Sequence, residues 1–300
     1  MGYMPQFAGG VWGTCNRRNM QVGQPSRTAL GAAMHRAAHQ VLEGGRIFAD
    51  PLALRILGED ATSITRDAER LASGRRMRIF IAVRTRFTED ALAEAVEGGV
   101  RQLVILGAGL DTYAYRGAMR DRLRIFEVDH PATQAWKRER LADAGIPHPD
   151  CLTFAPVDFE CETLPEGLLA AGFDCSLRTF FTWLGVVPYL TEDAIWSSLG
   201  FIAGLPGGVH VVFDYGDPPH TLSPEMRAHH EERAARVAEL GEEWKTYFQP
   251  GPLHTRLTEL GFAAIEDLGP REIAARYFPE RAAAMPGRGG HILHARTKTR

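Results

Sequence analysis

Residues 102–111 read Gln-Leu-Val-Ile-Leu-Gly-Ala-Gly-Leu-Asp, and this stretch decides the fold class. Five residues typical of a buried strand run directly into the turn Gly107-Ala108-Gly109. In a parallel sheet, ligands bind beyond the carboxyl ends of the strands, and glycine lets the backbone approach a ligand in conformations that a β-carbon forbids. The stretch therefore predicts the first strand of such a sheet, ending in a ligand-binding turn.

Short strands alternate with helical segments after this turn. The alternation implies right-handed crossovers and a mostly parallel sheet covered on both faces. Two final strands follow a helix that ends at Gly261, and they form a closing hairpin. The expected fold class is α/β, a Rossmann-like sheet of seven mostly parallel strands. The predicted strands are 102–106, 124–128, 152–156, 179–184, 209–213, 262–268 and 291–295, with helices at 132–144, 192–204 and 253–260.

The rest of the chain divides around this sheet. Residues 1–25 are rich in glycine and lack periodicity, so they are expected to form a flexible arm. Residues 26–98 are expected to form an N-terminal helical cap, and residues 99–300 the Rossmann-like domain. Within that domain, residues 217–248 are expected to form a helical insertion over the site. The cap's helices are predicted to start after Ser26, near Asp50-Pro51, and at Met77 with an end at Val96.

Composition excludes several classes of function. The chain has 300 residues, 45% apolar and 24% charged, which suits a globular protein with a sizeable core. A formal net charge of −3 gives no basic excess for nucleic acid. No segment is long and apolar enough to cross a membrane or to act as a secretory signal, so a cytoplasmic location is expected. The four cysteines include no CxxC pair, and no metal site is predicted.

Three acidic residues follow predicted strands and indicate a nucleoside-like ligand. Glu127 and Asp129 share one face of the second strand, where an acid can accept hydrogen bonds from ribose hydroxyls. Asp158 follows the third strand, where it can accept from an adenine amino group or simply form an Asx turn. A dinucleotide site requires a third glycine where this chain has Thr112, which weakens a nicotinamide or flavin interpretation.

These segments together resemble the leucine carboxyl methyltransferase family, and more closely its bacterial branch of S-adenosyl-L-methionine-dependent methyltransferases. The resemblance implies a class I methyltransferase fold, S-adenosyl-L-methionine as cofactor and S-adenosyl-L-homocysteine as product. It extends from about Ser26 to the end of the chain. The matching segments are 26–28 (SRT), 48–51 (FADP), 84–86 (RTR), 106–112 (LGAGLDT), 126–129 (FEVD), 157–159 (VDF) and 183–190 (WLGVVPYL).

The resemblance implies a role for each matching position. Arg84 would pair with the carboxylate of the methionine moiety, for which a planar guanidinium is suited, and Arg36 would lie near the same carboxylate. Asp129 would bind the ribose, while Asp158 and the backbone of Phe159 would read the adenine edge. The cofactor would lie along the turn residues Gly107, Ala108, Gly109 and Asp111, although Asp111 also suits a helix start.

Leu184 and Tyr189 lie in the matching segment 183–190, at the end of the fourth predicted strand. Relatives often carry a glutamate near the cofactor amino group where this chain has Leu184, so the ammonium would need another acceptor. Tyr189 is a candidate catalytic residue near the sulfonium or the acceptor, against the alternative of a packed aromatic residue with a satisfied hydroxyl. Arg227, Arg233 and Arg236 are interpreted as a solvated face, with reception of an anionic acceptor as the alternative.

The predicted function is therefore O-methylation (EC 2.1.1.-) of a small-molecule acceptor, on a carboxylate or a hydroxyl. A carboxylate is already ionised and needs no general base, whereas a hydroxyl needs one that no motif in the sequence identifies. His35 and His39, four apart on a helix, are interpreted as surface or partly buried residues. A non-catalytic S-adenosylmethionine-binding protein and, less favoured, an NAD(P)-dependent oxidoreductase remain as alternatives.

Overall fold

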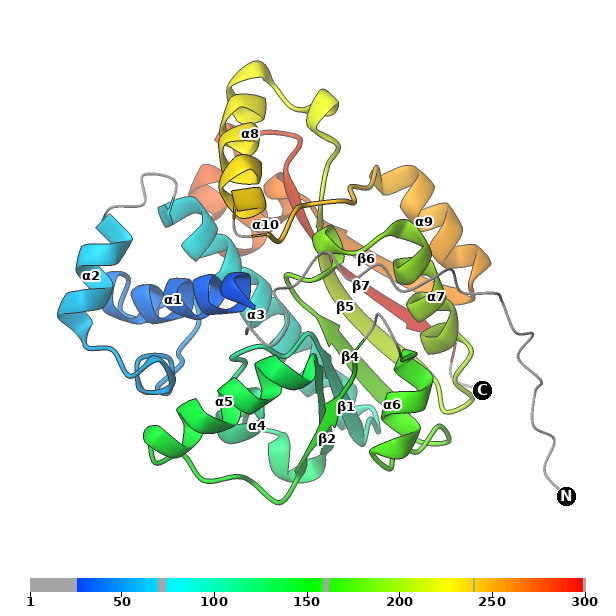
Figure 1. Cartoon of the computed structure of the whole chain (residues 1–300). Coiled ribbons are helices and arrows are strands. Elements are labelled where there is room, and N and C mark those ends of the chain that lie inside the picture. The colour runs from blue at the N-terminus through cyan, green and yellow to red at the C-terminus, as the bar shows by residue number, and fades with distance from the viewer. Residues whose placement is uncertain (1–25, 70–73, 159–161, 240, 299–300) are drawn as a thin grey trace, which may run out of the picture.

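The computed structural model describes residues 26–69, 74–158, 162–239 and 241–298. Its centre is one seven-stranded sheet with the order β3-β2-β1-β4-β5-β7-β6 (Figure 1). This order confirms the predicted Rossmann-like sheet with its closing hairpin. The strands are β1 (Gln102–Leu106), β2 (Arg124–Asp129), β3 (Leu152–Pro156), β4 (Thr179–Trp183), β5 (Val209–Gly216), β6 (Phe262–Leu268) and β7 (Gly290–Thr297).

The strand directions place all candidate ligand-binding turns at one edge of the sheet. β1 pairs in parallel with β2 on one side and β4 on the other, and β4 pairs in parallel with β5. β7 is antiparallel to both β5 and β6. Chain order reverses between β1 and β4, because β2 and β3 extend the sheet in the other direction. Ligands bind at such a switch point in open α/β sheets, so the turn after β1 stands in the expected place.

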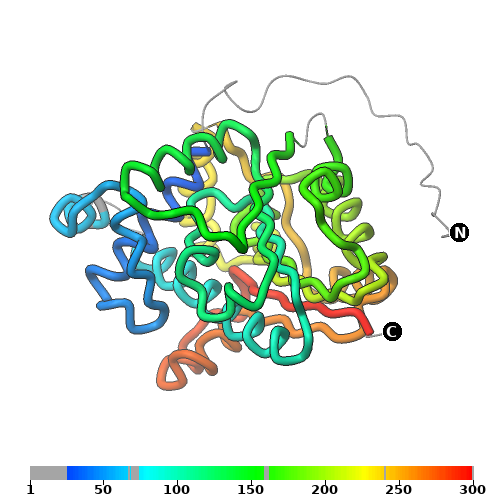
Figure 2. Tube along the Cα trace, turned by 90° about the horizontal axis from the view of Figure 1, so that it is seen from below, coloured from blue at the N-terminus to red at the C-terminus, as the bar shows by residue number. Residues whose placement is uncertain are grey.

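Helices cover both faces of the sheet, and alternate residues of the central strand enter two different hydrophobic cores. Leu103 and Ile105 pack with α1–α5, whereas Val104 and Leu106 pack with α6, α7 and α9. Figures 1 and 2 show these two groups of helices on opposite sides of the sheet. Burial on both faces explains why residues 103–106 of β1 are all apolar. The helices are α1 (Arg27–Leu42), α2 (Ala61–Glu69), α3 (Gly74–Glu97), α4 (Tyr113–Arg116), α5 (Pro131–Asp143), α6 (Leu164–Ala170), α7 (Glu192–Ala203), α8 (Pro224–Glu239), α9 (Pro250–Glu259) and α10 (Pro270–Tyr277).

The N-terminal helices follow the predicted capping pattern in part. Ser26 caps α1, and its hydroxyl accepts from the backbone N–H of Ala29 at 3.1 Å. The prediction of a helix starting near Asp50-Pro51 is wrong. Residues 51–54 form turns that lead into a short 3-10 helix, η1 (Arg55–Leu57), and Gly58 ends it with φ 67°. The Asp50 carboxylate accepts from Leu52 N–H and also from the Thr112 hydroxyl, which anchors this segment to the turn after β1.

The predicted N-terminal arm, residues 1–25, lies outside the described residues. The helices of the predicted cap share one hydrophobic core with the sheet, because Ala37 of α1 and Val83 of α3 belong to the cluster that contains Leu103. A separate cap at 26–98 stays a prediction. No helix in the described part of the chain is long and apolar enough to cross a membrane.

The predicted insertion consists of a helix and an irregular return segment. The charged stretch 224–244 predicts a helix over its whole length, but α8 ends at Glu239. Residues 241–249 then run back along the sheet edge without regular structure, and Lys245 N–H donates to the Pro188 carbonyl at 2.7 Å. Phe248 N–H donates to the carbonyl of Gly216, the last residue of β5, at 3.1 Å. The return segment therefore crosses the carboxyl ends of β4 and β5, while α8 projects beyond the sheet (Figure 1).

Candidate functional site

The turn after β1 has the conformation that its glycines predict. Gly107 and Gly109 have φ 63° and 46°, in the left-handed region that favours glycine. The backbone N–H groups of Gly107 and buried Ala108 both donate to the Val128 carbonyl, at 2.8 and 3.1 Å. The turn is thus bound to the end of β2, which brings the acidic residue of that strand beside it.

Asp129 joins the second strand to the glycine turn. One carboxylate oxygen accepts from Gly109 N–H at 2.6 Å, and the other accepts from His130 N–H at 2.7 Å. Burial raises the pKa of Asp129, and the two backbone donors oppose that rise. A carboxylate has about four lone-pair sites, so this one retains capacity for ligand hydroxyls.

Glu127 is placed differently from Asp129, although the two share one face of β2. It is fully buried, and its carboxylate accepts from the ammonium of Lys137 on α5 at 2.6 Å. Burial raises the pKa of Glu127 to about 7, against the opposing effect of Lys137. Of the two acids that the sequence left open for ribose, Asp129 alone lies at the glycine turn.

Two small side chains pack directly on the glycines. A β-carbon added at Gly107 would lie 2.3 Å from Cγ2 of Val186, the residue before η3 (Val187–Tyr189). A β-carbon at Gly109 would lie 2.9 Å from Cβ of Ala29 in the first turn of α1. The segment after β4 and the start of α1 therefore pack directly against the glycine turn. Any larger residue at either glycine would displace them.

Arg84 of α3 reaches the same edge of the sheet. Its guanidinium donates to Asp214 of β5 at 2.8 Å, and both side chains are buried. The other Asp214 oxygen accepts from Gly185 N–H at 2.6 Å, and a β-carbon at Gly185 would lie 2.8 Å from the guanidinium. Within the described residues the Nε atom of Arg84 is buried without a hydrogen-bond partner. Sequence reasoning missed Asp214, although an aspartate inside the apolar strand VHVVFDYG is a visible signal.

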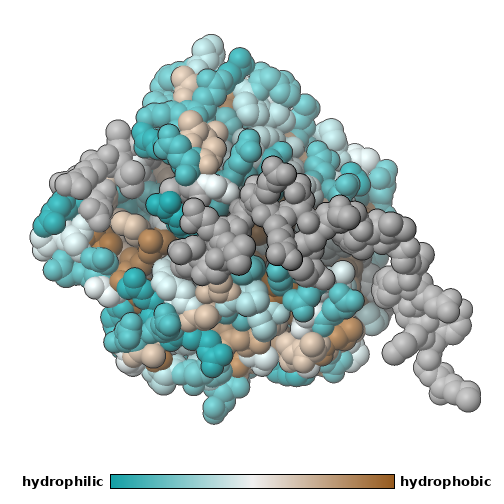
Figure 3. Space-filling view, viewed as in Figure 1, coloured by the Kyte–Doolittle hydropathy of each residue, from teal (hydrophilic) through white to brown (hydrophobic). Residues whose placement is uncertain are grey.

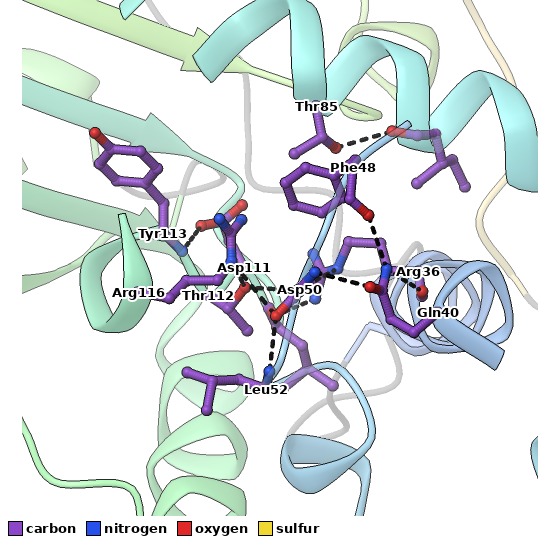
Figure 4. Close-up of polar contacts among 12 residues, drawn as sticks. Arg36, Gln40, Phe48, Asp50, Leu52, Thr85, Asp111, Thr112, Tyr113 and Arg116 are labelled. Carbon is purple, nitrogen blue, oxygen red and sulfur yellow. Dashed lines mark hydrogen bonds and ion pairs between the residues drawn. The ribbon is translucent and has the colours of Figure 1, made fainter. Parts of the chain in front are cut away.

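A polar network connects the 48–51 segment with the turn after β1, as Figure 4 shows. Buried Asp50 accepts from the Thr112 hydroxyl at 2.7 Å and lies 3.4 Å from the Arg116 guanidinium. Arg116 also donates twice to Glu89 of α3, at 3.1 and 2.6 Å. Thr112, which the sequence singled out only as a missing glycine, thus fixes the turn to the N-terminal segment. This network is not predictable from local sequence patterns, because its members lie far apart along the chain.

Arg36 belongs to this network. Its guanidinium donates to the carbonyl of Leu110 in the turn and lies 3.6 Å from Asp50. The atom nearest to Asp50 is Nε, which is buried and makes no hydrogen bond within the described residues. Arg36 therefore braces the glycine turn from the side of α1, and a role toward a ligand carboxylate stays a prediction.

Asp111 and Leu184 line one small cavity between α3 and the ends of β1 and β4. Asp111 accepts from Tyr113 N–H at 2.7 Å and so stabilises the start of α4, as its helix-start interpretation predicts. Leu184 packs against the core on the α3 side of the sheet. Glu89 also lines this cavity, and burial raises its pKa despite its pairing with Arg116. The full lining is Thr85, Thr88, Glu89, Leu92, Leu103, Ile105, Asp111, Tyr113, Thr182 and Leu184.

The predicted adenine-binding residues follow β3. Asp158 is half-buried, and its backbone N–H donates to Glu162 at 3.1 Å. Val157 N–H donates to the carbonyl of Asp129 at 2.9 Å, which keeps this segment next to the end of β2. Phe159 lies outside the described residues.

Tyr189 lies where the start of α1 meets the return segment after α8. The side chains of Thr28 and Trp244 lie beside its hydroxyl, and burial raises its pKa. Glu242 of the return segment accepts from Arg27 N–H at 2.7 Å and from the Ser26 hydroxyl at 3.1 Å. A tyrosine with a raised pKa stays protonated at neutral pH, so Tyr189 suits hydrogen-bond donation and not base catalysis.

The helix α8, which projects beyond this edge of the sheet, is largely exposed. Figure 3 shows a mostly hydrophilic surface over α8, which has no fully buried residue. Among the described residues no group of three or more histidine, cysteine, aspartate or glutamate side chains is arranged to hold a metal ion.

Comparison with known proteins places this arrangement in a defined class. A crystal structure of a candidate methyltransferase from Thermobifida fusca matches 93% of this chain and 97% of its own, with TM-score 0.55 and 14% sequence identity. A DUF574 family protein from Streptomyces avermitilis matches 88% of this chain and 97% of its own, with TM-score 0.50 and 15% identity. At these identities the likeness supports the fold, that of the class I methyltransferases.

Sequence relatives identify the family. The leucine carboxyl methyltransferase family matches residues 29–203. YktD of Bacillus subtilis (strain 168), named as a candidate S-adenosyl-L-methionine-dependent methyltransferase, is 31% identical over 92% of this chain and 99% of its own length. SCO7813 of Streptomyces coelicolor, with the same description, is 38% identical over 57% of this chain and 63% of its own. The chain belongs to the leucine carboxyl methyltransferase family of S-adenosyl-L-methionine-dependent methyltransferases.

Proposed function

We propose that this methyltransferase methylates an oxygen atom, most favourably a carboxylate, on a small-molecule acceptor. The observation that carries the assignment of the site is the hydrogen bond from Gly109 N–H to Asp129, which unites the glycine turn and a ligand-facing acid. The family description, leucine carboxyl methyltransferase, supports a carboxylate as the atom group that is methylated. A hydroxyl acceptor is the second candidate.

The residues at the turn fit S-adenosyl-L-methionine. We assign Gly107, Ala108 and Gly109 to backbone contact with the cofactor, Asp129 to its ribose hydroxyls and Asp158 to its adenine. Arg84 is assigned to the methionine carboxylate, because its buried Nε atom lacks a partner within the described residues. Asp214 would hold the guanidinium in place during binding. The bound cofactor supplies a methyl group on a positively charged sulfur.

The chemistry requires position more than proton transfer. A carboxylate acceptor is ionised at neutral pH, so no group on this chain needs to remove a proton. His35 on α1 is a poor base, because burial and the nearby charges of Arg78, Arg233 and Arg84 lower its pKa to about 4. Methyl transfer neutralises a cation and an anion together, which exclusion of water from the site favours. We assign that exclusion to the start of α1, η3 and the insertion 217–248.

Calorimetry tests the cofactor assignment first. We expect S-adenosyl-L-methionine and S-adenosyl-L-homocysteine to bind the purified chain, and NAD to give no heat. Binding of NAD in place of the sulfur ligands would instead support a nicotinamide-dependent oxidoreductase. Binding of the sulfur ligands without methyl transfer to any acceptor would support a non-catalytic binding protein, the interpretation that Leu184 favours.

A chemical test separates the two acceptor classes. Panels of carboxylic acids and of phenols would be incubated with the enzyme and S-adenosyl-L-methionine, and release of S-adenosyl-L-homocysteine measured. A methyl ester releases methanol in mild alkali, whereas a methyl ether does not. We expect methanol from the carboxylic acid panel; alkali-stable products alone would contradict carboxylate methylation.

A further inference from the structure

The three arginines of α8 have different environments. Arg227 donates to the backbone carbonyls of Pro219 and His220, both at 3.1 Å, and so braces the segment before the helix. Arg236 pairs with Glu232 one turn away on the exposed face. Arg233 has no carboxylate partner among the described residues. The sequence treats all three as one solvated face, but Arg233 is half-buried and turned toward the rest of the molecule.

Arg233 lies in a group of aromatic and sulfur-containing side chains. Its guanidinium carbon is 5.1 Å from the centre of the Trp244 ring, and one nitrogen is 3.9 Å from the Met77 sulfur on α3. His230 stacks on Trp244 with ring centres 5.2 Å apart, and its ring nitrogen is 3.0 Å from the Tyr247 hydroxyl. Burial lowers the pKa of Arg233, which is the direction expected for a cation removed from water without an ionic partner.

Three arginines lie near His35, and Arg233 is the one that has no carboxylate partner among the described residues. His35 lies within the electrostatic influence of Arg78, Arg84 and Arg233. Arg78 is held by Glu43 through two hydrogen bonds of 2.7 Å each, and Arg84 is held by Asp214. No described acid plays this part for Arg233. A desolvated guanidinium is costly to leave unpaired, and a planar anion supplies the matching pair of acceptors.

We propose that Arg233 receives the carboxylate of the methyl acceptor, and that Trp244 and Tyr247 contact the apolar part of the same molecule. Tyr189 links this group to the cofactor site. The backbone N–H of Lys245, next to Trp244, donates to the carbonyl of Pro188, next to Tyr189, at 2.7 Å, and Val186 of the same segment packs on Gly107. This assignment rests on the proposed function, which supplies the methyl donor at the glycine turn. The acceptor class is a small carboxylic acid with an apolar or aromatic body.

Pairing with Arg233 would also favour release of the methylated product over the acid. The guanidinium would hold the carboxylate, and a lone pair of one carboxylate oxygen would attack the methyl carbon. The new carbon–oxygen bond uses a carboxylate electron pair, and the electrons of the broken carbon–sulfur bond stay on sulfur. The sulfonium becomes a neutral thioether and the carboxylate a neutral ester. The ester has lost the charge that pairs with Arg233, so the product binds more weakly than the acid.

The experiment compares charged and neutral probes on the full chain saturated with S-adenosyl-L-homocysteine. Calorimetry would give the Kd of benzoate, octanoate and their amides for the wild type, Arg233→Gln, Arg233→Lys and Arg236→Gln. Arg236→Gln is the matched control, because it removes a guanidinium three residues away on the exposed face of the same helix. We expect the wild type and Arg236→Gln to bind at least one acid tenfold more tightly than its amide. Arg233→Gln should reduce that ratio to within threefold, and Arg233→Lys should retain part of it.

The outcomes separate this assignment from the proposed function. Affinity for S-adenosyl-L-homocysteine is measured first in every variant, and its absence in the wild type would overturn the proposed function. With that affinity intact, an acid-to-amide ratio that survives in Arg233→Gln would overturn the role of Arg233. Equal binding of acids and amides by the wild type would overturn it too. A tripeptide ending in leucine serves as a further probe, and its binding in place of both small acids would contradict a small-molecule acceptor.

Discussion

At the scale of single residues, the neighbouring atoms decide whether a glycine is required only for its backbone conformation or also for close packing. Gly107 and Gly145 have nearly the same backbone conformation, with φ 63° and 61°. A β-carbon at Gly145 would meet no atom within 4 Å, whereas one at Gly107 would lie 2.3 Å from Val186. The backbone requirement is common to both positions, and the close approach of another segment is specific to the candidate site.

Alanine substitution at these two glycines separates the two effects. Gly145→Ala should lower the free energy of unfolding by about 1–2 kcal/mol, the cost of a left-handed conformation for a residue with a β-carbon. Gly107→Ala should cost more than this, because Val186 must also move. It should also weaken binding of S-adenosyl-L-methionine. Chemical denaturation and calorimetry would measure both quantities, and equal effects of the two substitutions would contradict the close packing at Gly107.

The role assigned to Arg84 in cofactor binding can be tested by substitution. Arg84→Ala should weaken S-adenosyl-L-methionine binding at least tenfold, about 1.4 kcal/mol, because the guanidinium is the assigned partner of the methionine carboxylate. A change within threefold would contradict that role. Asp214→Asn keeps the shape of the residue that positions Arg84, and we expect it to have a smaller effect than Arg84→Ala in the same calorimetric measurement.

At the scale of elements, the start of α1 is fixed by a segment more than 200 positions away along the chain. The Glu242 carboxylate accepts hydrogen bonds from the backbone N–H groups of Arg27 and Thr28, which have no partner within the helix. A negative charge at a helix N-terminus also interacts favourably with the helix dipole. Glu242 thus connects the insertion to the helix that covers the glycine turn.

Removal of this charge should release the start of α1. Glu242→Gln is expected to lower the free energy of unfolding by about 0.5–2 kcal/mol, the range for loss of a helix cap. Amide hydrogen exchange at Arg27 and Thr28 should become faster. Glu239→Gln is the control, because Glu239 is exposed near the end of α8. Unchanged exchange at both amides would show that Glu242 does not hold this helix.

At the scale of the whole molecule, groups far from the site set the response to pH. His210 near the start of β5 and His294 on β7 form a stacked pair with ring nitrogens 3.1 Å apart. Burial lowers the pKa of each to about 4. At these two histidines the folded protein therefore binds fewer protons than the unfolded chain between pH 4 and 6.5, so their contribution to stability falls as pH decreases through this window.

Buried His291 acts in the opposite direction. It lies between Asp267 and Asp217, at 3.0 and 3.2 Å, and these carboxylates raise its pKa although burial opposes them. Its contribution is fully present below the unfolded pKa of about 6.5 and is lost as pH rises through its own higher folded value. The two histidine environments together favour a maximum of stability near neutral pH.

The substitution His294→Gln tests this balance. Between pH 6.5 and 4 the variant should lose stability less steeply than the wild type, because one buried group that resists protonation is gone. Urea denaturation at a series of pH values would measure the slopes, with His148→Gln as an exposed control. Affinity for S-adenosyl-L-homocysteine at pH 7 should stay unchanged, since the pair lies toward the opposite end of β5 from Asp214. Parallel slopes for wild type and variant would contradict the prediction.

The sequence by itself determined the fold class and the order of the strands. Periodicity and glycine placement located the seven strands and most longer helices, because buried parallel strands and amphipathic helices leave local patterns. The turn at 107–109 and Asp129 were also visible locally, since both lie at predicted strand ends. The helices α2, α4, α6 and α10 were not found, because segments of four to nine residues carry little periodicity.

Only the tertiary structure decided which distant residues meet. Asp214 holds Arg84, Asp50 holds Thr112, and Glu242 holds the start of α1, across separations of 130, 62 and about 215 residues. The tertiary structure also gives Arg233 surroundings that differ from those of Arg227 and Arg236 on the same helix. The physical reason is that hydrogen bonds and ion pairs depend on distance in space, and chain crossovers bring together groups whose local sequences carry no mark of the partner.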